Sequence, residues 1–363
     1  MTCRMLAVFA LVVGGAVAGE PAGTLKVDPV ELIRGNEVAG RPELAATHYR
    51  FRYLFANETN KAEFEEHPEQ FEIQLGGACA RMGALSGTGQ TDLYAVHEGK
   101  IYIFASEACR HTFLDDPDRV LDRPEAVPTG SDAAKRAGRA LLAKAVGAMG
   151  GAGPIDAISV YQEREESQSE WEGTTYEVID LVTIQFPDKV RTDHVWGDDR
   201  YTMVVTADDA WREHPRETFS MHAQQRRVAE AQYLGRNLLA ILKNRDNPAL
   251  TAVHIGSDEI DDDGESTPVE LVAVHYRGAT STLGIDPKSG RVLFQAYHGR
   301  GPGAMLGKVE RIFSDFESAG GVLLPKRPEM RFDGEEMDDE DDAKRTVAVN
   351  VPLAPNFFRR PNP

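Results

Sequence analysis

The spacing of apolar residues changes once along this chain, near residue 155. After that point apolar and polar residues alternate in one segment after another, as in residues 175–186, which is the pattern of half-buried strands. Turn signals such as Gly173-Thr174 and Lys288-Ser289-Gly290 separate most of these segments. About eleven strands over roughly 200 residues predict one large, strongly curved antiparallel sheet, a half-barrel.

Two segments follow the helical period instead. Residues 133–149 place one set of apolar side chains on a single face: Leu141, Leu142, Ala145 and Met149. Residues 223–244 do the same with Val228, Ala231, Leu238, Leu239 and Leu242. Both helices are expected to cover the concave face of the sheet. The polar segment 123–132, which contains two prolines and a glycine, is predicted to be a linker.

The N-terminal part contains an internal repeat. Residues 53–68 return without a gap as residues 102–117, so that Tyr53, Phe64 and Pro68 align with Tyr102, Phe113 and Pro117. Each copy runs from an aromatic strand into a short helix. Such a repeat predicts two copies of one unit, each too small to bury its apolar face alone, that pack together.

Composition and charge limit the function classes. A chain of 363 residues with 41% hydrophobic residues is long enough for two globular domains. The formal net charge of −18 and the pI near 5.0 argue against binding to nucleic acid or to an anionic membrane surface.

The first eighteen residues have the pattern of a secretory signal peptide. Arg4 provides the positive start, an apolar stretch follows, and Ala16-Val17-Ala18 forms a cleavage site of small residues. No later apolar run reaches the length of about 18 residues that a membrane-spanning helix needs, so no transmembrane segment is expected in the mature chain. The sequence therefore predicts an exported, periplasmic protein.

A resemblance is carried by Asp28-Pro29-Val30, by the GGACA motif at 76–80 and by GKIYIFASEACRHTFLDDP at 99–117. Residues 25–122 resemble the YHS domain, a small module related to the TRASH metal-binding domains. The resemblance implies a metal-binding origin, with Cys79 and Cys109 as ligands of zinc or copper and with His97 and His111 as further candidates. The sequence departs from the metal-binding pattern at Glu31 and Ala105, where the family has cysteine.

Cys79 and Cys109 are the two cysteines that remain after export. In an oxidising compartment the first expectation for two cysteines is a disulfide, here closing a loop of about 30 residues. A metal site and two free buried thiols are the alternatives, and a metal site needs three or four ligands of which these cysteines supply two.

A second resemblance covers residues 133–361. It rests on WGDDRYTMVVTADDAW at 196–211, on the helix at 223–244 and on the order of strands that ends in RTVAVNVPLAPNFFRRP at 345–361. This part resembles the outer-membrane lipoprotein carrier (LolA-like) family. The resemblance implies a half-barrel whose apolar concavity holds an acyl chain or a lipidated partner. Candidate residues of its wall are Trp196, Met203, Val205, Trp211, Phe219 and Met221, for each of which an ordinary core role is the alternative.

No motif of catalysis is present in the sequence: it contains no nucleophile elbow, no phosphate-binding glycine loop and no zinc-protease helix. The acidic segment 259–270 partly follows a calcium-loop spacing but is interpreted as a solvated hairpin, and residues 337–342 as a solvated turn. The sequence thus predicts an α+β protein: a signal peptide (1–18), a small duplicated strand-helix domain (25–122), a linker (123–132) and a large curved sheet with two covering helices (133–361). The leading hypothesis is a non-enzymatic carrier of an apolar or lipidated ligand. A metal-binding or redox module and a structural envelope protein are the alternatives.

Overall fold

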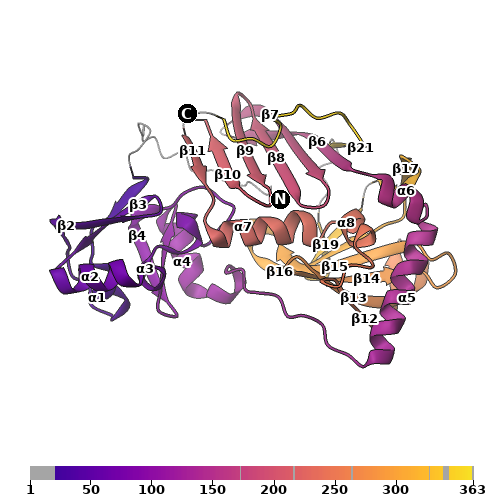
Figure 1. The fold of residues 1–363 in the computed structure, drawn as a ribbon, viewed down its shortest axis with the longest axis horizontal. Coiled ribbons are helices and arrows are strands. Elements are labelled where there is room, and N and C mark those ends of the chain that lie inside the picture. The colour runs from indigo at the N-terminus through magenta and orange to yellow at the C-terminus, as the bar shows by residue number, and fades with distance from the viewer. Residues whose placement is uncertain are drawn as a thin grey trace.

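The computed structural model describes residues 21–171, 173–215, 217–262, 265–326, 328–337 and 343–361. The predicted signal peptide at 1–18 lies outside the described residues, as does most of the acidic segment 337–342. The chain forms an α+β fold in which an N-terminal unit packs against two large antiparallel sheets, with helices between and beside them (Figure 1).

The sequence repeat of the N-terminal unit is also a repeat of structure. Each copy contains an antiparallel hairpin and a nine-residue helix: β2 (Arg41–His48), β3 (Phe51–Phe55) and α2 (Glu58–Glu66) in the first, and β4 (Gln90–His97), β5 (Lys100–Phe104) and α4 (Glu107–Asp115) in the second. The pairing of each hairpin is interrupted at equivalent places, between Arg41 and Ala45 and between Gln90 and Tyr94. Asn57 and Ser106 cap the two helices through their side chains. We call these copies the first repeat and the second repeat.

Short elements complete this unit. They are β1 (Gly23–Leu25), which pairs with β3 in parallel, α1 (Pro29–Ile33), α3 (Pro68–Phe71), η1 (Gln74–Gly77) and η2 (Pro117–Arg119). The helix α1 begins directly after Asp28. The Asp28 side chain accepts hydrogen bonds from the backbone N–H groups of Val30 and Glu31, and a proline follows it at the first helical position.

The single curved sheet expected after residue 155 is divided into two sheets of seven strands. The strands of the first are β6 (Val160–Trp171), β7 (Thr174–Gln185), β8 (Lys189–Trp196), β9 (Asp199–Val205), β10 (Ala210–His214), β11 (Glu217–Ser220) and β21 (Lys344–Val349). The strands of the second are β12 (Thr251–Asp262), β13 (Glu265–Tyr276), β14 (Ala279–Ile285), β15 (Val292–Arg300), β16 (Leu306–Ile312), β19 (Glu329–Phe332) and β20 (Glu335–Glu336). The separation occurs where helices, rather than a turn, follow β11. The predicted acidic hairpin is confirmed, since β12 pairs with β13.

A smaller two-stranded sheet, β17 (Phe316–Ala319) with β18 (Val322–Pro325), and the short turn η4 (Pro302–Ala304) complete the strand-rich part.

The helix predicted at 223–244 is interrupted. It consists of α7 (Ala223–Glu230), one π-helical turn η3 (Ala231–Gly235) and α8 (Leu238–Lys243). Gly235 passes so close to β13 and β14 that a Cβ atom there would lie 2.5 Å from the Tyr276 carbonyl oxygen. Asn237 then starts the new helix by accepting a hydrogen bond from the Ala240 N–H group.

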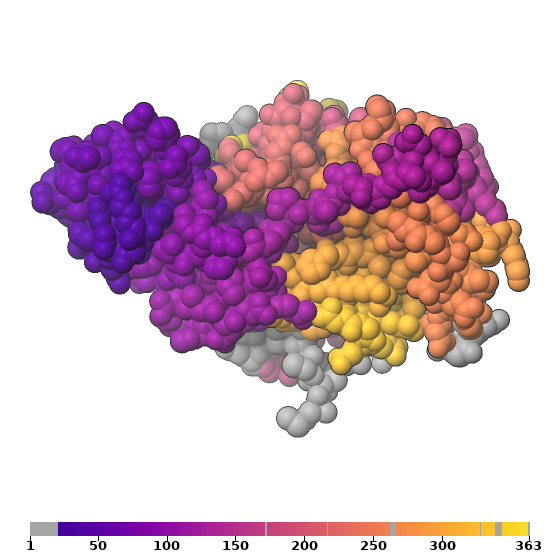
Figure 2. Space-filling model, turned by 90° about the horizontal axis from the view of Figure 1, so that it is seen from below, coloured from indigo at the N-terminus to yellow at the C-terminus, as the bar shows by residue number. Residues whose placement is uncertain are grey.

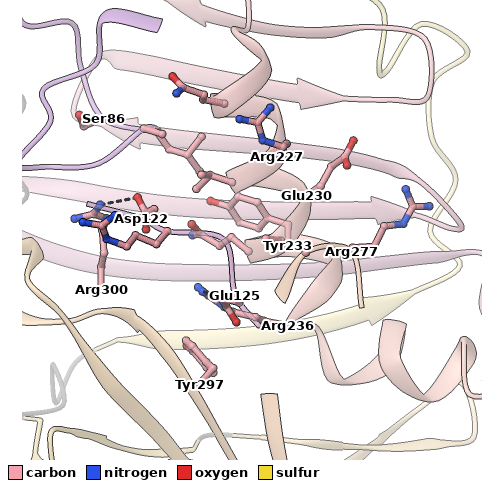
Figure 3. A pocket seen from close by; sticks show the side chains of 18 of the residues that line it. Ser86, Asp122, Glu125, Arg227, Glu230, Tyr233, Arg236, Arg277, Tyr297 and Arg300 are labelled. Carbon is pink, nitrogen blue, oxygen red and sulfur yellow. Dashed lines mark hydrogen bonds and ion pairs between the residues drawn. The ribbon is translucent and has the colours of Figure 1, made fainter. Parts of the chain in front are cut away.

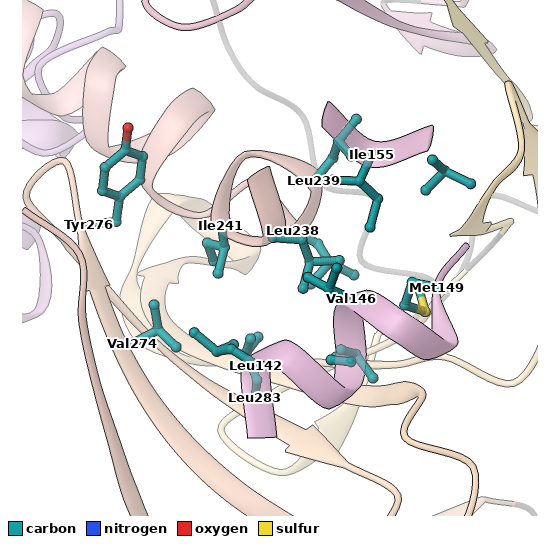
Figure 4. Packing of buried hydrophobic residues seen from close by; sticks show 14 of the residues in the cluster. Leu142, Val146, Met149, Ile155, Leu238, Leu239, Ile241, Val274, Tyr276 and Leu283 are labelled. Carbon is teal, nitrogen blue, oxygen red and sulfur yellow. The ribbon is translucent and has the colours of Figure 1, made fainter. Parts of the chain in front are cut away.

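The main core joins both large sheets through helices. The helix predicted at 133–149 is α5 (Asp132–Ala148), which is followed by α6 (Ala152–Ala157) and lies on β12 and β13. Gly138 permits this contact, because a Cβ atom there would lie 2.9 Å from the Ala252 carbonyl. Buried side chains from α5, α8 and the two sheets pack together, among them Leu142, Met149, Leu239, Ile241, Val274 and Leu283 (Figure 4). A fully buried leucine contributes about 2 kcal/mol, so this cluster is the main source of stability of the large domain.

Among the helices of the described residues, none has both the length and the apolar character needed to pass through a bilayer.

Candidate functional site

Helices fill only part of the space between the two sheets. Where the space approaches the N-terminal unit, a cavity of about 1240 Å³ is left. Its lining comes from η1 and the loop after it, from the segment 122–125, from β6 and β7, from α7 and η3, from the β13–β14 turn, and from β15, η4 and β16 (Figure 3). Pockets for small molecules have volumes of about 300 to 1,000 Å³. This cavity is therefore large enough for a sizeable ligand.

The N-terminal unit supplies one wall of the cavity. Its loop at 75–87 contributes six lining residues: Leu75, Met82, Ala84, Leu85, Ser86 and Gly87. Arg212 of β10, only 6% exposed, donates hydrogen bonds to the Leu85 and Ser86 carbonyl oxygens at 2.8 and 2.9 Å. Burial lowers the pKa of Arg212 to about 10, and the carbonyl oxygens satisfy donors that would otherwise be unpaired. The loop is thus fixed to the first sheet.

Helix α7 holds the same loop from another side. The Gln225 side chain, 2% exposed, donates to the Ala84 carbonyl oxygen at 3.1 Å, and the Gln224 side chain donates to that of Gln74 at 2.8 Å. Gly76 has a φ of +60°, and a Cβ atom there would lie 2.6 Å from the Cβ atom of His222. A residue without a side chain is required at this contact.

The first repeat also touches the first sheet. Arg50 forms an ion pair with Glu217 at 2.7 Å and lies 3.5 Å from the centre of the Phe219 ring. The Glu72 carboxylate lies between His48 and His222, at 3.0 and 3.2 Å. Burial by itself raises the pKa of Glu72, but the hydrogen bonds from His222 and His48 outweigh it, and the pKa lies below its usual value.

Together these contacts join the two predicted domains. In the space-filling view the N-terminal unit lies directly against the strand-rich part, and the segment leading to α5 crosses the surface (Figure 2). The cavity is therefore a feature of the whole chain and is incomplete without the N-terminal unit.

Apolar and polar side chains both reach the cavity. Met82 and Val228 pack against a buried cluster of the second repeat that includes Leu75 and Ala84. Tyr233 lies near the middle of the lining in the close view (Figure 3). Burial raises the pKa of Tyr233 to about 12, so its hydroxyl is neutral at physiological pH. An amphiphilic ligand matches such a lining better than a purely apolar one.

None of the six residues predicted to form the wall is among those that line the cavity. Met203, Val205 and Met221 lie one layer behind it, in a buried cluster against which the lining residues Leu85 and Tyr233 pack. The remaining three are located elsewhere on the first sheet. Trp211 is 1% exposed, Phe219 lies under Arg50, and Trp196 stands beside Tyr176 with ring centres 5.7 Å apart. Met203, Val205, Trp211 and Met221 are buried, as the alternative of an ordinary core role expects.

The structure brings Cys79 and Cys109 together. Both are free thiols in the structure, Cys79 buried and Cys109 half-buried. A hydrogen bond from the Cys79 thiol lowers the pKa of Cys109, and the Ser106 hydroxyl and the Arg81 cation act in the same direction. The same interaction, together with burial, raises the pKa of Cys79. The predicted disulfide needs contact between these two side chains, and the fold provides it.

The same cysteines do not complete a metal site. Among the described residues, no group of three or more His, Cys, Asp or Glu side chains is arranged to hold a metal ion. His97 packs edge-on against the Phe113 ring, 5.8 Å between ring centres, and His111 is exposed on α4. Two thiols are fewer than the three or four ligands that zinc or copper(I) requires, so the residues present do not fit such an ion.

Sequence reasoning missed the residues that line the cavity. Those of the β13–β14 turn, of β16 and of the loop at 75–87 are far apart along the chain, and no local pattern connects them. One signal was available. Gln224, Arg227, Val228 and Ala231 recur at helical spacing and form the stripe of α7 and η3 that faces the cavity.

Comparisons with known proteins give distant similarities only. No protein-family profile matches the chain, and no curated protein matches it. Among solved structures, it is similar to a DUF1329 family protein from Desulfovibrio piger, with 12% identity over 62% of this chain and 97% of that one and a TM-score of 0.38. It is also similar to an outer-membrane lipoprotein-sorting protein domain from Vibrio parahaemolyticus (10% identity, 62% and 97% covered, TM-score 0.36) and to a LolA superfamily protein from Nitrosomonas europaea (11% identity, 60% and 97% covered, TM-score 0.34). At such scores the similarities assign neither a family nor a ligand.

Proposed function

We propose that this protein is a non-enzymatic binding protein that holds a lipid, an acyl chain or a lipidated partner in the cavity between its two sheets. The observation that carries the proposal is the cavity of about 1240 Å³, whose lining includes the apolar side chains of Leu75, Met82, Ala84 and Val228 and which the helices between the sheets leave unfilled. The signal-like residues 1–18 support export to the periplasm as the place where this binding occurs.

Purified protein tests the proposal directly. Organic extraction followed by mass spectrometry should release a co-purifying lipid, and delipidated protein should take up a neutral apolar dye such as N-phenyl-1-naphthylamine. Ala231→Trp, which places a large side chain in the lining, should abolish uptake. Ala223→Trp, on the exposed side of α7, is the matched control and should bind dye normally. Absence of both lipid and dye uptake would refute the carrier function.

A second candidate function is a thiol redox module in the second repeat. It is favoured by the position of the two free cysteines in one packed cluster, where the interaction with Cys79 lowers the pKa of Cys109 to about 5. Thiol titration of the denatured protein, with elemental analysis, separates the states. If no free thiol is detected and no metal is bound, the two cysteines form a disulfide. Two free thiols together with stoichiometric zinc or copper would instead indicate a metal site.

A further inference from the structure

Positive side chains outnumber negative ones in the lining of the cavity, whereas negative side chains dominate the chain as a whole. The chain has a formal net charge of −18, yet six arginines and four carboxylates line the cavity. The arginines are Arg123, Arg227, Arg236, Arg277, Arg300 and Arg311, and the carboxylates are Asp122, Glu125, Glu163 and Glu230. In the close view Arg227, Arg236, Arg277 and Arg300 surround Tyr233 (Figure 3).

Each lining carboxylate already has an arginine partner. Asp122 pairs with Arg300 and Glu125 with Arg236, each at 2.6 Å. The other two pair with arginines outside this cavity: Glu163 with Arg345 at 2.6 Å and Glu230 with Arg226 at 3.0 Å. Each of these ion pairs offsets the charge of its carboxylate, while Glu230 also acts at longer range on Arg277, and Glu163 on Arg311.

Four lining arginines remain. Arg123 pairs with Asp118 and Glu98, at 2.6 and 3.1 Å, but within the described ranges Arg227, Arg277 and Arg311 form no ion pair with a carboxylate. These three come from α7, from the β13–β14 turn and from β16. Only the tertiary fold brings them to one cavity.

A guanidinium in a partly enclosed space, with no carboxylate at ion-pair distance, favours an anion. Arginine presents a planar fork that binds carboxylate or phosphate oxygens in pairs, more strongly than neutral donors do. The negative charges on the outside do not cancel this effect, because salt screens exposed charges beyond about 8 Å at physiological ionic strength. The same lining also includes the apolar side chains of Leu75, Met82, Ala84 and Val228.

We infer that the cavity selects anionic amphiphiles. Arg227, Arg277 and Arg311 bind a carboxylate or phosphate headgroup, and the apolar side chains of the second repeat and α7 hold the attached chain. This inference rests on the proposed carrier function and adds to it the chemical class of the ligand.

Displacement of the neutral dye by matched ligands tests the inference. Hexadecanoate and hexadecanol have the same chain and differ in charge, and both are used below the concentrations at which they aggregate. We expect hexadecanoate to displace the dye at a concentration at least about tenfold lower, as one good charge-assisted contact provides. Hexadecyl phosphate should act like hexadecanoate, whereas inorganic phosphate at the same concentration should leave the dye bound.

Variants identify the residues. In the triple variant Arg227→Gln, Arg277→Gln, Arg311→Gln, hexadecanoate and hexadecanol should displace the dye at equal concentrations, each corrected for the affinity of that variant for the dye. Arg123→Gln, whose guanidinium is already paired, should keep the preference. If the triple variant is unstable by thermal unfolding, the single variants Arg227→Gln and Arg277→Gln should each reduce the preference about two- to threefold.

The failures are distinguishable. Equal displacement by hexadecanol and hexadecanoate overturns the selection of anions and leaves the carrier function intact. Displacement by inorganic phosphate as efficient as by hexadecyl phosphate overturns the role of the chain. If the dye, the alcohol and the acid all fail to bind, the carrier function fails, and this inference with it.

Discussion

The two repeats of the N-terminal unit use one geometry with two different chemistries. In the first, the buried Asp28 carboxylate accepts hydrogen bonds from the Ala56 N–H group at 2.7 Å and from the Asn60 side chain at 2.8 Å. In the second, the Cys79 thiol takes the place of the carboxylate. It interacts with the Cys109 thiol, which raises the pKa of Cys79, and with the backbone of Ala105, which opposes that rise. Ala105 and Cys109 are the residues that align with Ala56 and Asn60 in the sequence repeat.

The pair Asp28 and Asn60 and the pair Cys79 and Cys109 each connect a loop to the start of a helix. They differ in whether the connection can become covalent. A carboxylate and an amide form a fixed hydrogen bond, whereas two thiols can be joined covalently by oxidation. The second repeat also supplies the loop that forms the cavity wall. The tether that is open to chemical change therefore lies in the repeat that faces the cavity.

The largest effect is expected in the first repeat. Asp28→Ala leaves three backbone N–H groups and the Asn60 amide without their acceptor and should lower the free energy of unfolding by about 4 kcal/mol. Asp28→Asn, which keeps one accepting oxygen, should cost less. Under reducing conditions Cys79→Ala should cost only about 1 to 2 kcal/mol, because a small buried side chain is lost. Urea unfolding measures all three, and an equal cost for Asp28→Ala and Cys79→Ala would break the comparison.

Oxidation should affect only the second repeat. A Cys79–Cys109 disulfide closes a loop of about 30 residues and should raise the free energy of unfolding by about 3 kcal/mol. Urea unfolding with and without a reducing agent measures the difference. In the control variant Cys109→Ser, oxidised and reduced protein should be equally stable. Unchanged stability of the wild-type protein after complete oxidation would contradict a Cys79–Cys109 disulfide.

Glycine substitutions compare the attachment of the two repeats. Gly76→Ala combines an unfavourable φ of +60° with a contact of 2.6 Å to His222 and should cost about 2 kcal/mol. Gly35→Ala, with a φ of +87° but no atom within 4 Å, should cost about 1 kcal/mol. Dye uptake should fall with Gly76→Ala alone, since that loop forms the cavity wall. Equal effects on uptake would show that the loop position does not matter.

The smallest effect concerns pH. The pKa of Glu72 is lowered in the folded protein, so its contribution to stability is present above the unfolded value near 4.5 and is lost as the pH falls through the folded value. Thermal unfolding should therefore show a loss of stability below about pH 4.5 that is weaker in Glu72→Gln. If the wild-type protein and Glu72→Gln lose the same stability below this pH, other carboxylates cause the loss.

Local patterns in the sequence determined much of the fold. The repeat at 53–68 and 102–117, the helix at 133–149 and the strand-rich character after residue 155 follow from spacing and turn residues, and all three are confirmed. Helix capping by Asp28 and the interruption at Gly235 were not predicted. The first depends on a single side chain, and the second on a contact with strands about forty residues away.

The tertiary structure alone decided the division into two sheets, the position of the cavity and the residues that line it. Periodicity states which side of a strand is buried, but it does not state what covers that side. Met203 and Val205 carry the pattern expected of a wall and lie behind it, while Arg277 and Arg311 carry no special pattern and line the cavity. A cavity is the space that packing leaves between distant segments, and its lining is set by how those segments meet rather than by the sequence of any one of them.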